Sequence, residues 1–262
     1  MKKSSRLMEV TGVTDLGGRR FRLRLKADAL HMKAEPGQFF NIAFEDGNPY
    51  LPRPFSIYEM HRDTNEISFL IAAVGVGTRR LQSCRPGDTL RLTGPLGNTF
   101  PVDPKATHHL HVAGSIGLAP FIELSLAIEK ARPGVRQTLI YGARTAAELV
   151  DMKFLENYPW KIVGVTDDGT RGRKGRVTDV LKELLGAEGT VVYACGPHPM
   201  LDAVRALCGT TPCWLSLEER MACGMGICKG CVIHHDSMEP PLPTVCKSGP
   251  IFSARALATM HP

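Results

Sequence analysis

The stretch VAGSIGLAP, residues 112–120, joins an apolar run to a helical pattern through a glycine-rich turn. The run predicts a buried strand, and the pattern predicts a helix. Small residues at such a turn let backbone N–H groups approach an anion at the start of the helix, where the helix dipole favours negative charge. Alone, the turn fits a tight structural connection as well as a nucleotide-phosphate site. Its position at the head of an alternating segment favours the nucleotide interpretation.

Strand and helix patterns alternate downstream of this turn. The expected strands lie at 109–113, 137–141, 160–165, 190–195 and 213–217. The expected helices lie at 118–131, 145–155, 177–185 and 200–208. Such alternation predicts an α/β domain, a doubly wound parallel sheet with helices on both faces.

The first hundred residues predict β structure instead. Residues 19–26 alternate strictly between apolar and basic side chains, which is typical of a strand with one buried face. Further short apolar runs, separated by turn signals such as Pro36-Gly37, lie at 39–44, 54–58, 67–74 and 89–93. Short strands at this spacing indicate a small antiparallel β-barrel. We therefore expect a barrel over 1–100, the α/β domain over 101–217 and a small loop-rich lobe over 218–262.

Composition limits the function classes. With 262 residues, 22% charged and 43% hydrophobic, the chain is neither disordered nor a small disulfide scaffold. The net charge of +6 is spread along the chain, so it is a weak argument for nucleic acid and an adequate one for an anionic cofactor. No apolar stretch approaches the roughly 18 residues of a membrane span, and MKKSSRLMEV lacks the apolar segment of a signal peptide. We expect a soluble, cytoplasmic protein with no nucleic-acid or membrane partner.

The cysteines form the most specific pattern. Four of the eight lie close together near the C-terminal end, namely Cys223, Cys228, Cys231 and Cys246. The spacing Cys-x4-Cys-x2-Cys with a later fourth cysteine is typical of plant-type 2Fe–2S sites. Gly224, Gly226 and Gly230 would let a tight loop direct the sulfurs inward and leave backbone N–H groups to bond them. The alternatives are structural zinc, which prefers Cys-x2-Cys pairs, and free buried cysteines.

Two weaker motifs complete the set. In Arg53-Pro54-Phe55-Ser56, the arginine could clamp a phosphate and the serine could hydrogen-bond a ring nitrogen or a ribityl hydroxyl. A match of four residues alone is as often coincidence. The segment Tyr193-Ala194-Cys195-Gly196-Pro197 ends an expected strand at the carboxyl edge of the sheet, where α/β folds place ligands.

Together these motifs resemble the ferredoxin–NADP reductase superfamily and, within it, the electron-transfer subunits of class 1B dihydroorotate dehydrogenases. The resemblance covers nearly the whole chain. The motifs RPFS, GVGT, GPLGNTF, GSIGLAP, YGART, YACGPHPM, RMACGMGICKGC and VCKSGPIF occur in the family's order. A single match would be weak, but the ordered series is specific. The sequence departs from the family at Ser115, where glycine is usual and where a side chain could narrow the approach to a pyrophosphate.

The resemblance implies a set of site residues. Arg53 would lie on the FAD pyrophosphate and Ser56 near the flavin ring. The other residues implied to line FAD are Pro54, Phe55, Leu70, Ile71, Ala72, Gly77 and Thr78. Those implied to face NAD(H) are Gly114, Ser115, Gly117, Pro120, Gly196 and Pro197, with Cys195 as the catalytic residue that influences nicotinamide placement. Cys223, Cys228, Cys231 and Cys246 would bind the 2Fe–2S cluster.

The implied function is electron transfer. NADH would give a hydride to FAD, and single electrons would pass through the cluster to an FMN-containing dihydroorotate dehydrogenase catalytic subunit of pyrimidine biosynthesis, in a heterotetramer of two copies of each. Arg144 would suit the extra phosphate of NADPH, but the negative charges of Asp167 and Asp168 disfavour it. NADH is favoured mainly by the resemblance. One alternative is an electron-transfer subunit of a hydrogenase or ferredoxin reductase complex, and another is a non-catalytic zinc-binding docking module. Cys84, Cys208 and Cys213 are expected to be small buried hydrophobes.

Overall fold

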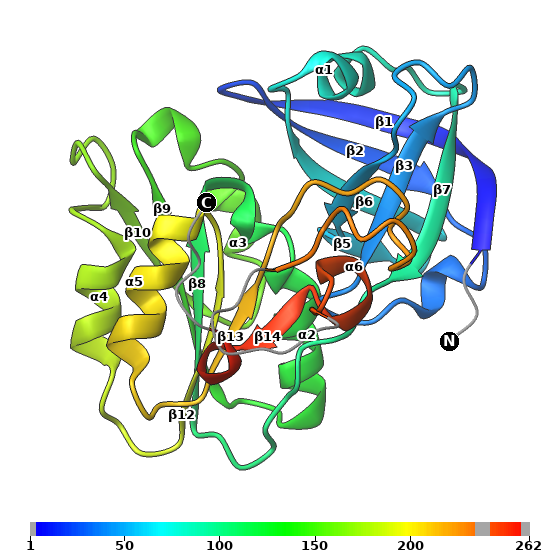
Figure 1. The fold of residues 1–262 in the computed structure, drawn as a ribbon. Helices are drawn as coiled ribbons and strands as arrows, with labels where there is room; N and C mark the ends of the chain where they lie inside the picture. The colour runs from blue at the N-terminus through cyan, green and yellow to red at the C-terminus, as the bar shows by residue number, and fades with distance from the viewer. Residues whose placement is uncertain (1–3, 234–241, 258–262) are drawn as a thin grey trace.

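The computed structural model describes residues 4–233 and 242–257, which form two sheets that lie side by side (Figure 1). The first sheet is antiparallel, in the order β4-β3-β7-β1-β2-β6-β5. Its strands are β1 (Ser4–Gly17), β2 (Arg20–Lys26), β3 (Phe39–Phe44), β4 (Arg53–Ser56), β5 (Glu59–His61), β6 (Glu66–Ala72) and β7 (Thr89–Leu96). The expected antiparallel β architecture of the first hundred residues is therefore confirmed.

Strand β1 makes this sheet curl. Its first half, Ser4 to Glu9, pairs with β7, and its second half, from Val10 onward, pairs with β2. One strand shared between two neighbours brings the ends of the sheet round on each other. The sequence analysis did not predict β1, because only Met8 and Val10 along its length are buried and the alternation is therefore weak.

The second sheet is parallel except at one edge, in the order β11-β10-β9-β8-β12-β13-β14. Its strands are β8 (His108–Gly114), β9 (Arg136–Ala143), β10 (Lys161–Thr166), β11 (Arg173–Lys174), β12 (Thr190–Cys195), β13 (Cys213–Ser216) and β14 (Ile251–Ser253). This confirms the predicted doubly wound sheet. The antiparallel edge strand β14 comes from the C-terminal segment, so the predicted cluster lobe is attached to this sheet through backbone hydrogen bonds.

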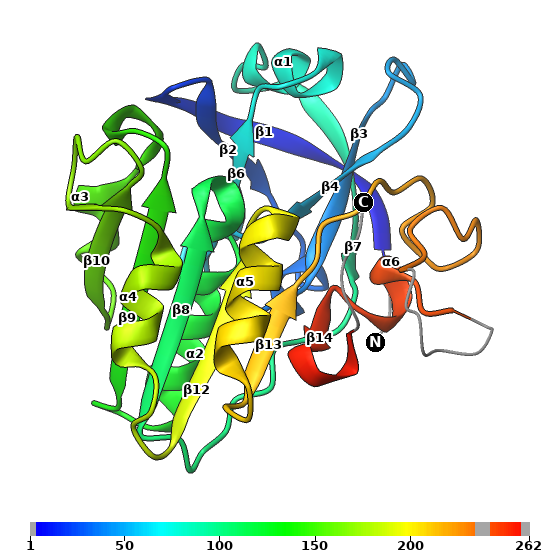
Figure 2. The same cartoon turned by 60° about the vertical axis from the view of Figure 1, so that its left-hand side comes forward.

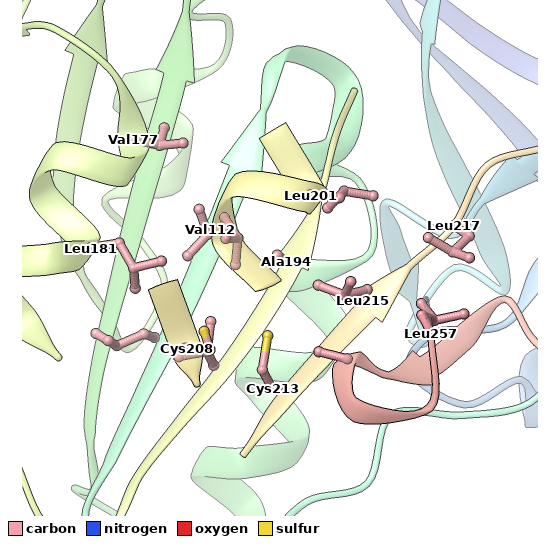
Figure 3. Close-up of a cluster of buried hydrophobic side chains, with 14 of the residues drawn as sticks. Val112, Val177, Leu181, Ala194, Leu201, Cys208, Cys213, Leu215, Leu217 and Leu257 are labelled. Carbon is pink, nitrogen blue, oxygen red and sulfur yellow. The ribbon is translucent and has the colours of Figure 1, made fainter. Parts of the chain in front are cut away.

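Helices cover both faces of the second sheet (Figure 2). Helices α4 (Val177–Leu184) and α5 (His198–Cys208) pack on one face, where Figure 3 shows Leu181 and Leu201 close to Val112 of β8. Helix α2 (Phe121–Ala131) packs on the opposite face, toward the first sheet. The predicted burial of Cys208 and Cys213 is confirmed, because both belong to the core on the α4–α5 side.

The remaining helical elements are short. The predicted helix at 145–155 is instead two pieces, the 3-10 turn η3 (Ala146–Glu148) and α3 (Met152–Leu155), because Asp151 adopts a left-handed φ of 57° between them. The others are η1 (His31–Lys33), α1 (Val76–Gln82), η2 (Ser115–Leu118), α6 (Val245–Ser248) and η4 (Ala254–Ala256). None of the helices in the described parts of the chain is long and apolar enough to span a bilayer.

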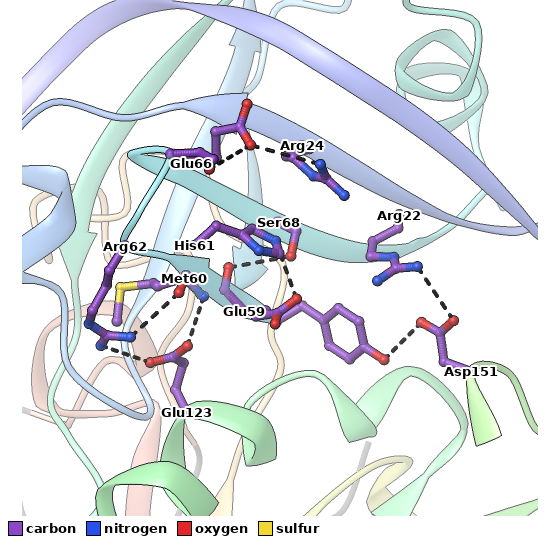
Figure 4. A network of polar contacts seen from close by, with 12 residues as sticks. Arg22, Arg24, Glu59, Met60, His61, Arg62, Glu66, Ser68, Glu123 and Asp151 are labelled. Atoms are coloured by element: carbon purple, nitrogen blue, oxygen red, sulfur yellow. Dashed lines mark hydrogen bonds and ion pairs between the residues drawn. The ribbon is translucent and has the colours of Figure 1, made fainter. Parts of the chain in front are cut away.

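Polar contacts lock the first sheet onto the second (Figure 4). Glu123 of α2 is 3% exposed, and its carboxylate accepts the Met60 backbone N–H at 2.7 Å and an Arg62 N–H at 3.1 Å. Burial raises the pKa of the Glu123 carboxyl, which the Met60 and Arg62 contacts oppose. Tyr58 donates to Asp151 at 2.9 Å farther along the same boundary. The relative position of the two sheets is therefore specified by side chains from both.

Replacing Glu123 with Ala should destabilise the protein. The substitution leaves the buried Met60 N–H without an acceptor, which costs about 1–3 kcal/mol of unfolding free energy. Denaturant titration of the purified chain measures this loss. Glu129→Ala on the same helix is the control, because the Glu129 carboxylate bonds only an exposed backbone N–H, and we expect a change within about 0.5 kcal/mol. Equal effects of the two substitutions would contradict this account of the boundary.

Candidate functional site

A cavity of about 670 Å³ lies over the carboxyl ends of β8, β9 and β12, and we call it the larger cavity to distinguish it from a smaller one between the two sheets. Strands β9 and β12 flank β8 on its two sides, so this is the point at which the strand order of the sheet reverses. Open α/β sheets bind ligands at such a point. The cavity is lined by Arg20, Gly114, Ser115, Gly142, Ala143, Arg144, Glu148, Asp167, Gly175, Arg176, Val177, Thr178, Pro197, Pro199, Met200 and Ala203.

Tight packing holds the two turns at the floor of the larger cavity together. A Cβ on Gly117 would lie 2.2 Å from the Cys195 carbonyl oxygen, and one on Gly196 would lie 2.6 Å from the Met200 methyl group. Glycine is therefore required at Gly117, where the neighbour is backbone; at Gly196 the Met200 methyl group could move, but the φ of 157° is one that other residues rarely adopt. Of the residues expected to face NAD(H), Gly114, Ser115 and Pro197 line the cavity directly. The others, Gly117, Pro120 and Gly196, shape the turns that carry these three.

Cys195 lies beneath this cavity. Its side chain is fully buried in the core on the α2 side of the sheet and lines neither of the two cavities. Burial raises the pKa of the Cys195 thiol well above its usual range. The structure therefore places the Cys195 backbone, rather than its sulfur, against the turn at Gly117.

The smaller cavity, about 390 Å³, lies between the two sheets. Of the residues that the sequence analysis expects to line FAD, Pro54, Phe55 and Ser56 of β4 and Leu70 of β6 line this cavity. The Ile71 side chain points the other way into the core of the first sheet, because successive strand residues face opposite sides. The remaining lining residues come from other segments and are Phe39, Ile116, Ala119, Leu217, Glu218, Glu219, Arg220, Met221 and Pro250.

Arg53, Gly77 and Thr78 form a separate contact beside β4. A Cβ on Gly77 would lie 2.0 Å from the Arg53 Nε, so the guanidinium rests directly on the backbone at the start of α1. The Thr78 hydroxyl accepts the Gly75 N–H at 2.9 Å and fixes the same turn. Ala72 follows at the end of β6 and shares the face of Leu70. None of these residues lines the smaller cavity.

Glu218 is a cavity residue that the sequence analysis missed. It follows β13 and lines the smaller cavity, and its side chain is exposed. A carboxylate directly after an apolar strand is common on protein surfaces. Only the fold brings Glu218 and the serine of RPFS, Ser56, to the same cavity.

The cysteine loop, residues 223–231, surrounds its sulfurs with backbone N–H groups. The N–H groups of Met225 and Cys228 each lie 3.4 Å from the Cys223 Sγ, and the Gly226 N–H lies 3.0 Å from the Cys246 Sγ. Burial alone would raise the pKa of Cys223, but these N–H bonds lower it to about 6. The loop therefore stabilises the thiolate of Cys223, which is the form that binds iron, whereas burial raises the pKa of Cys246 to about 11.

The sulfurs are arranged in two pairs. The Cys228 N–H lies 3.4 Å from the Cys223 Sγ, and the Cys246 N–H lies 3.5 Å from the Cys231 Sγ. Among the described residues, no three Cys, His, Asp or Glu side chains converge on one point to hold a single ion. A structural zinc needs four ligands about one centre, whereas two pairs suit a cluster with two metal ions.

The three sites adjoin one another. The turn that floors the larger cavity contributes Ile116 and Ala119 to the smaller one. The smaller cavity is also lined by Met221, two residues before the cysteine loop. A Cβ on Gly224 of this loop would lie 2.4 Å from the Asn41 amide of β3, so the loop packs on the first sheet. The turn at 114–119 therefore borders both cavities, and Met221 connects the smaller one to the cysteine loop along the chain.

Family comparisons assign a description to each part of the chain. Residues 8–100 match the family described as "Oxidoreductase FAD-binding domain", and residues 112–206 match "Oxidoreductase NAD-binding domain". Residues 218–258 match "Iron-sulfur cluster binding domain of dihydroorotate dehydrogenase B".

Individual relatives agree along the whole chain. The chain is 36% identical over 250 residues to the dihydroorotate dehydrogenase B (NAD(+)) electron transfer subunit of Bacillus caldolyticus, covering 94% of this chain and 96% of the relative. It is 36% identical over 262 residues to the subunit of the same name from Bacillus velezensis, covering 98% and 100%. Among solved structures, a chain of the NADH-dependent reduced ferredoxin–NADP oxidoreductase superposes with a TM-score of 0.85 at 25% identity, covering 97% of this chain and 90% of that one.

Substituting Ala for Gly117 tests the contact on which both cavities depend. The added Cβ would overlap the Cys195 backbone, which cannot move without displacing β12, so we expect a loss of about 1–3 kcal/mol of unfolding free energy. Gly12→Ala is the matched control, because a Cβ there meets nothing within 4 Å. Denaturant unfolding of both variants measures the difference. A Gly117→Ala protein as stable as the control would show that the turn has room for a side chain.

Proposed function

Because the chain belongs to the family of dihydroorotate dehydrogenase B electron transfer subunits, we propose that it passes electrons from NADH through FAD and a 2Fe–2S cluster to an FMN-containing catalytic subunit. The chain is an oxidoreductase subunit with FAD-binding, NAD-binding and iron–sulfur-binding domains. The observation that carries the proposal is that one turn, residues 114–119, contributes to both cavities, while Met221 of the smaller cavity leads directly into the cysteine loop.

We assign each group to a set of residues. The larger cavity would hold NAD(H), with its phosphates at Gly114 and Ser115. The smaller cavity would hold the flavin ring against Phe55 and Ser56, and Arg53 would bind the FAD pyrophosphate. When bound, FAD exchanges a hydride with NAD(H) and the cluster carries single electrons.

The chain's own residues fit these groups. Ser56 offers a hydroxyl that can donate to a ring nitrogen, and Phe55, Leu70 and Ile116 give apolar walls that exclude water from the smaller cavity. The backbone N–H groups around Cys223 and Cys246 favour thiolate and would lower the charge on cluster sulfurs. The Cys195 backbone would hold the turn at Gly117, which lies between the two cavities, and the Cys195 thiol would not react itself.

The partner and location are proposals on the same basis. The relatives are named as electron transfer subunits, which implies a catalytic partner that performs the oxidation of dihydroorotate. We propose an FMN-containing subunit, a heterotetramer with two copies of each chain, and a cytoplasmic location. Mixing the purified chain with that subunit and measuring dihydroorotate-dependent reduction of NAD+ tests the partner. An acceptor protein of another kind, such as a ferredoxin or a hydrogenase subunit, would be the outcome if no such activity appears.

Replacing Arg53 with Ala should weaken FAD binding. Loss of a charge-assisted contact to the pyrophosphate costs roughly 1.5–3 kcal/mol, so the purified variant should lose its flavin absorbance while the four cluster cysteines are untouched. Flavin content per chain and the dissociation constant for added FAD measure this effect. Arg91→Ala, on the exposed face of β7, is the control and should keep full flavin content. A normal FAD content in Arg53→Ala would remove Arg53 from the pyrophosphate site.

Replacing Cys228 with Ala should separate two activities. The variant keeps the lining residues of both cavities, all of which except Pro250 precede the cysteine loop in the chain, so NADH oxidation with a small artificial acceptor should persist. It should lose the cluster, because three thiolates remain, and transfer to the catalytic subunit should collapse. Iron analysis and the two assays measure this, with Cys84→Ala as a control outside the loop. Partner-dependent turnover near the normal rate without iron would make the cluster a structural element only.

A further inference from the structure

We infer that Arg20, from the first sheet, binds the diphosphate of the dinucleotide in the larger cavity, and that Ser115 positions it there. Arg20 is the first residue of β2 and yet lines the cavity over the second sheet. The inference rests on the proposed function, since it requires that this cavity take NAD(H). It adds a residue from the opposite sheet to a site otherwise built from β8, β9, β12 and their turns.

Arg20 is held in place by contacts from both sheets. Its Nη1 donates to the Gly18 carbonyl at 2.8 Å, and its Nη2 donates to the Ser115 hydroxyl oxygen at 3.0 Å. The residue is 8% exposed, so its guanidinium is largely withdrawn from bulk water although it borders the cavity. A cation fixed in this way loses little conformational entropy when it meets an anion.

The charge of Arg20 is only partly compensated. The nearest carboxylate oxygen, on Glu148, lies 3.5 Å from Nη2, which is longer than the 2.7–2.9 Å of a strong charge-assisted bond. Within the described residues, the buried Nε has no hydrogen-bond partner. A buried guanidinium with incomplete pairing is costly to keep unless a ligand completes it. Because Arg20 borders the turn at Gly114 and Ser115, that ligand is an anion held at this turn.

The contacts of the Ser115 hydroxyl explain why a serine stands at this position of the turn. Its φ of 54° lies in the left-handed region, where glycine is preferred and a serine is strained. The hydroxyl oxygen accepts the Arg20 N–H, and its own hydrogen remains to donate to a phosphate oxygen. The departure from glycine therefore adds two polar functions, one that positions Arg20 and one that faces the ligand.

Arg20 also connects the dinucleotide to the flavin side. In the β2–β6 pairing, Arg20 lies opposite Ala72, two residues from Leu70, which lines the smaller cavity. An anion bound by Arg20 would thus be held by the strand pair that borders the flavin site. The contact between Arg20 and the bound diphosphate would then help to fix the distance between the two cavities, in addition to the packing between the sheets.

Binding measurements on the full-length, FAD-loaded and cluster-loaded protein test the inference. Isothermal titration with NAD+ and with ADP should show roughly 10- to 100-fold weaker binding for Arg20→Gln. Arg24→Gln is the matched control, because Arg24 lies on the same face of β2, pairs with Glu66 and does not line the larger cavity. The affinity of the normal protein should fall with ionic strength, and this dependence should be weaker in Arg20→Gln because one cation no longer contacts the diphosphate.

The positioning role of Ser115 has its own readout. Ser115→Ala removes the hydroxyl and should weaken NAD+ binding by a smaller factor. In the Arg20→Gln background the same substitution should have a reduced effect, because the residues act partly as a unit. Additive effects of the two substitutions would overturn the positioning role.

The outcomes separate the inference from the function on which it rests. If the normal protein binds neither NAD+ nor ADP, the proposed function fails. If it binds both and Arg20→Gln binds them equally well, the inference alone fails. Flavin content and thermal unfolding show whether Arg20→Gln disturbs the boundary between the sheets. If it does, Arg20→Lys decides: an ionic-strength dependence like that of the normal protein supports the diphosphate contact, and one as weak as that of Arg20→Gln overturns it.

Discussion

The contact between Gly117 and the Cys195 carbonyl oxygen is the constraint on which the rest of the structure depends. It holds the turn after β8 against the end of β12, and a Cβ on Gly117 would lie 2.2 Å from that oxygen. Residues on one side of this turn, Gly114 and Ser115, line the larger cavity. Residues on the other side, Ile116 and Ala119, line the smaller one. A single glycine thus lets one turn serve two binding sites that must lie close together for electron transfer.

The main electrostatic interactions of the molecule come from backbone N–H groups and from buried charged side chains. Backbone N–H groups surround the sulfurs of the cysteine loop, and the glycines among the cysteines let these groups approach. The carboxylate of Glu123 and the guanidinium of Arg20 are both buried and both link the first sheet to the second. Buried groups of this kind are costly unless paired, so they fix the two sheets in one relative position. That position brings segments distant in the sequence together around the smaller cavity.

The C-terminal segment belongs to both halves of the molecule. Its strand β14 pairs with β13 of the second sheet, while Gly224 of the cysteine loop packs on Asn41 of the first. Pro250 and Met221 from the same segment line the smaller cavity. The cysteines that we propose as cluster ligands are therefore attached to the walls of the smaller cavity, the proposed flavin site. This arrangement suits a relay, because the distance between the two sites is set by direct packing.

The sequence by itself determined the local features of this protein. The alternation of apolar runs and helical patterns predicted the second sheet, and the spacing from Cys223 to Cys231 indicated the metal chemistry, because both depend on residues close in the chain. It did not show β1, whose pairing with two different strands outweighs its weak alternation. Nor did it show Arg20 or Glu218. An arginine in an alternating strand looks like part of a solvated face, and a carboxylate after a strand looks like surface. Only the tertiary structure decided that both border cavities, because that depends on which distant segments pack against them.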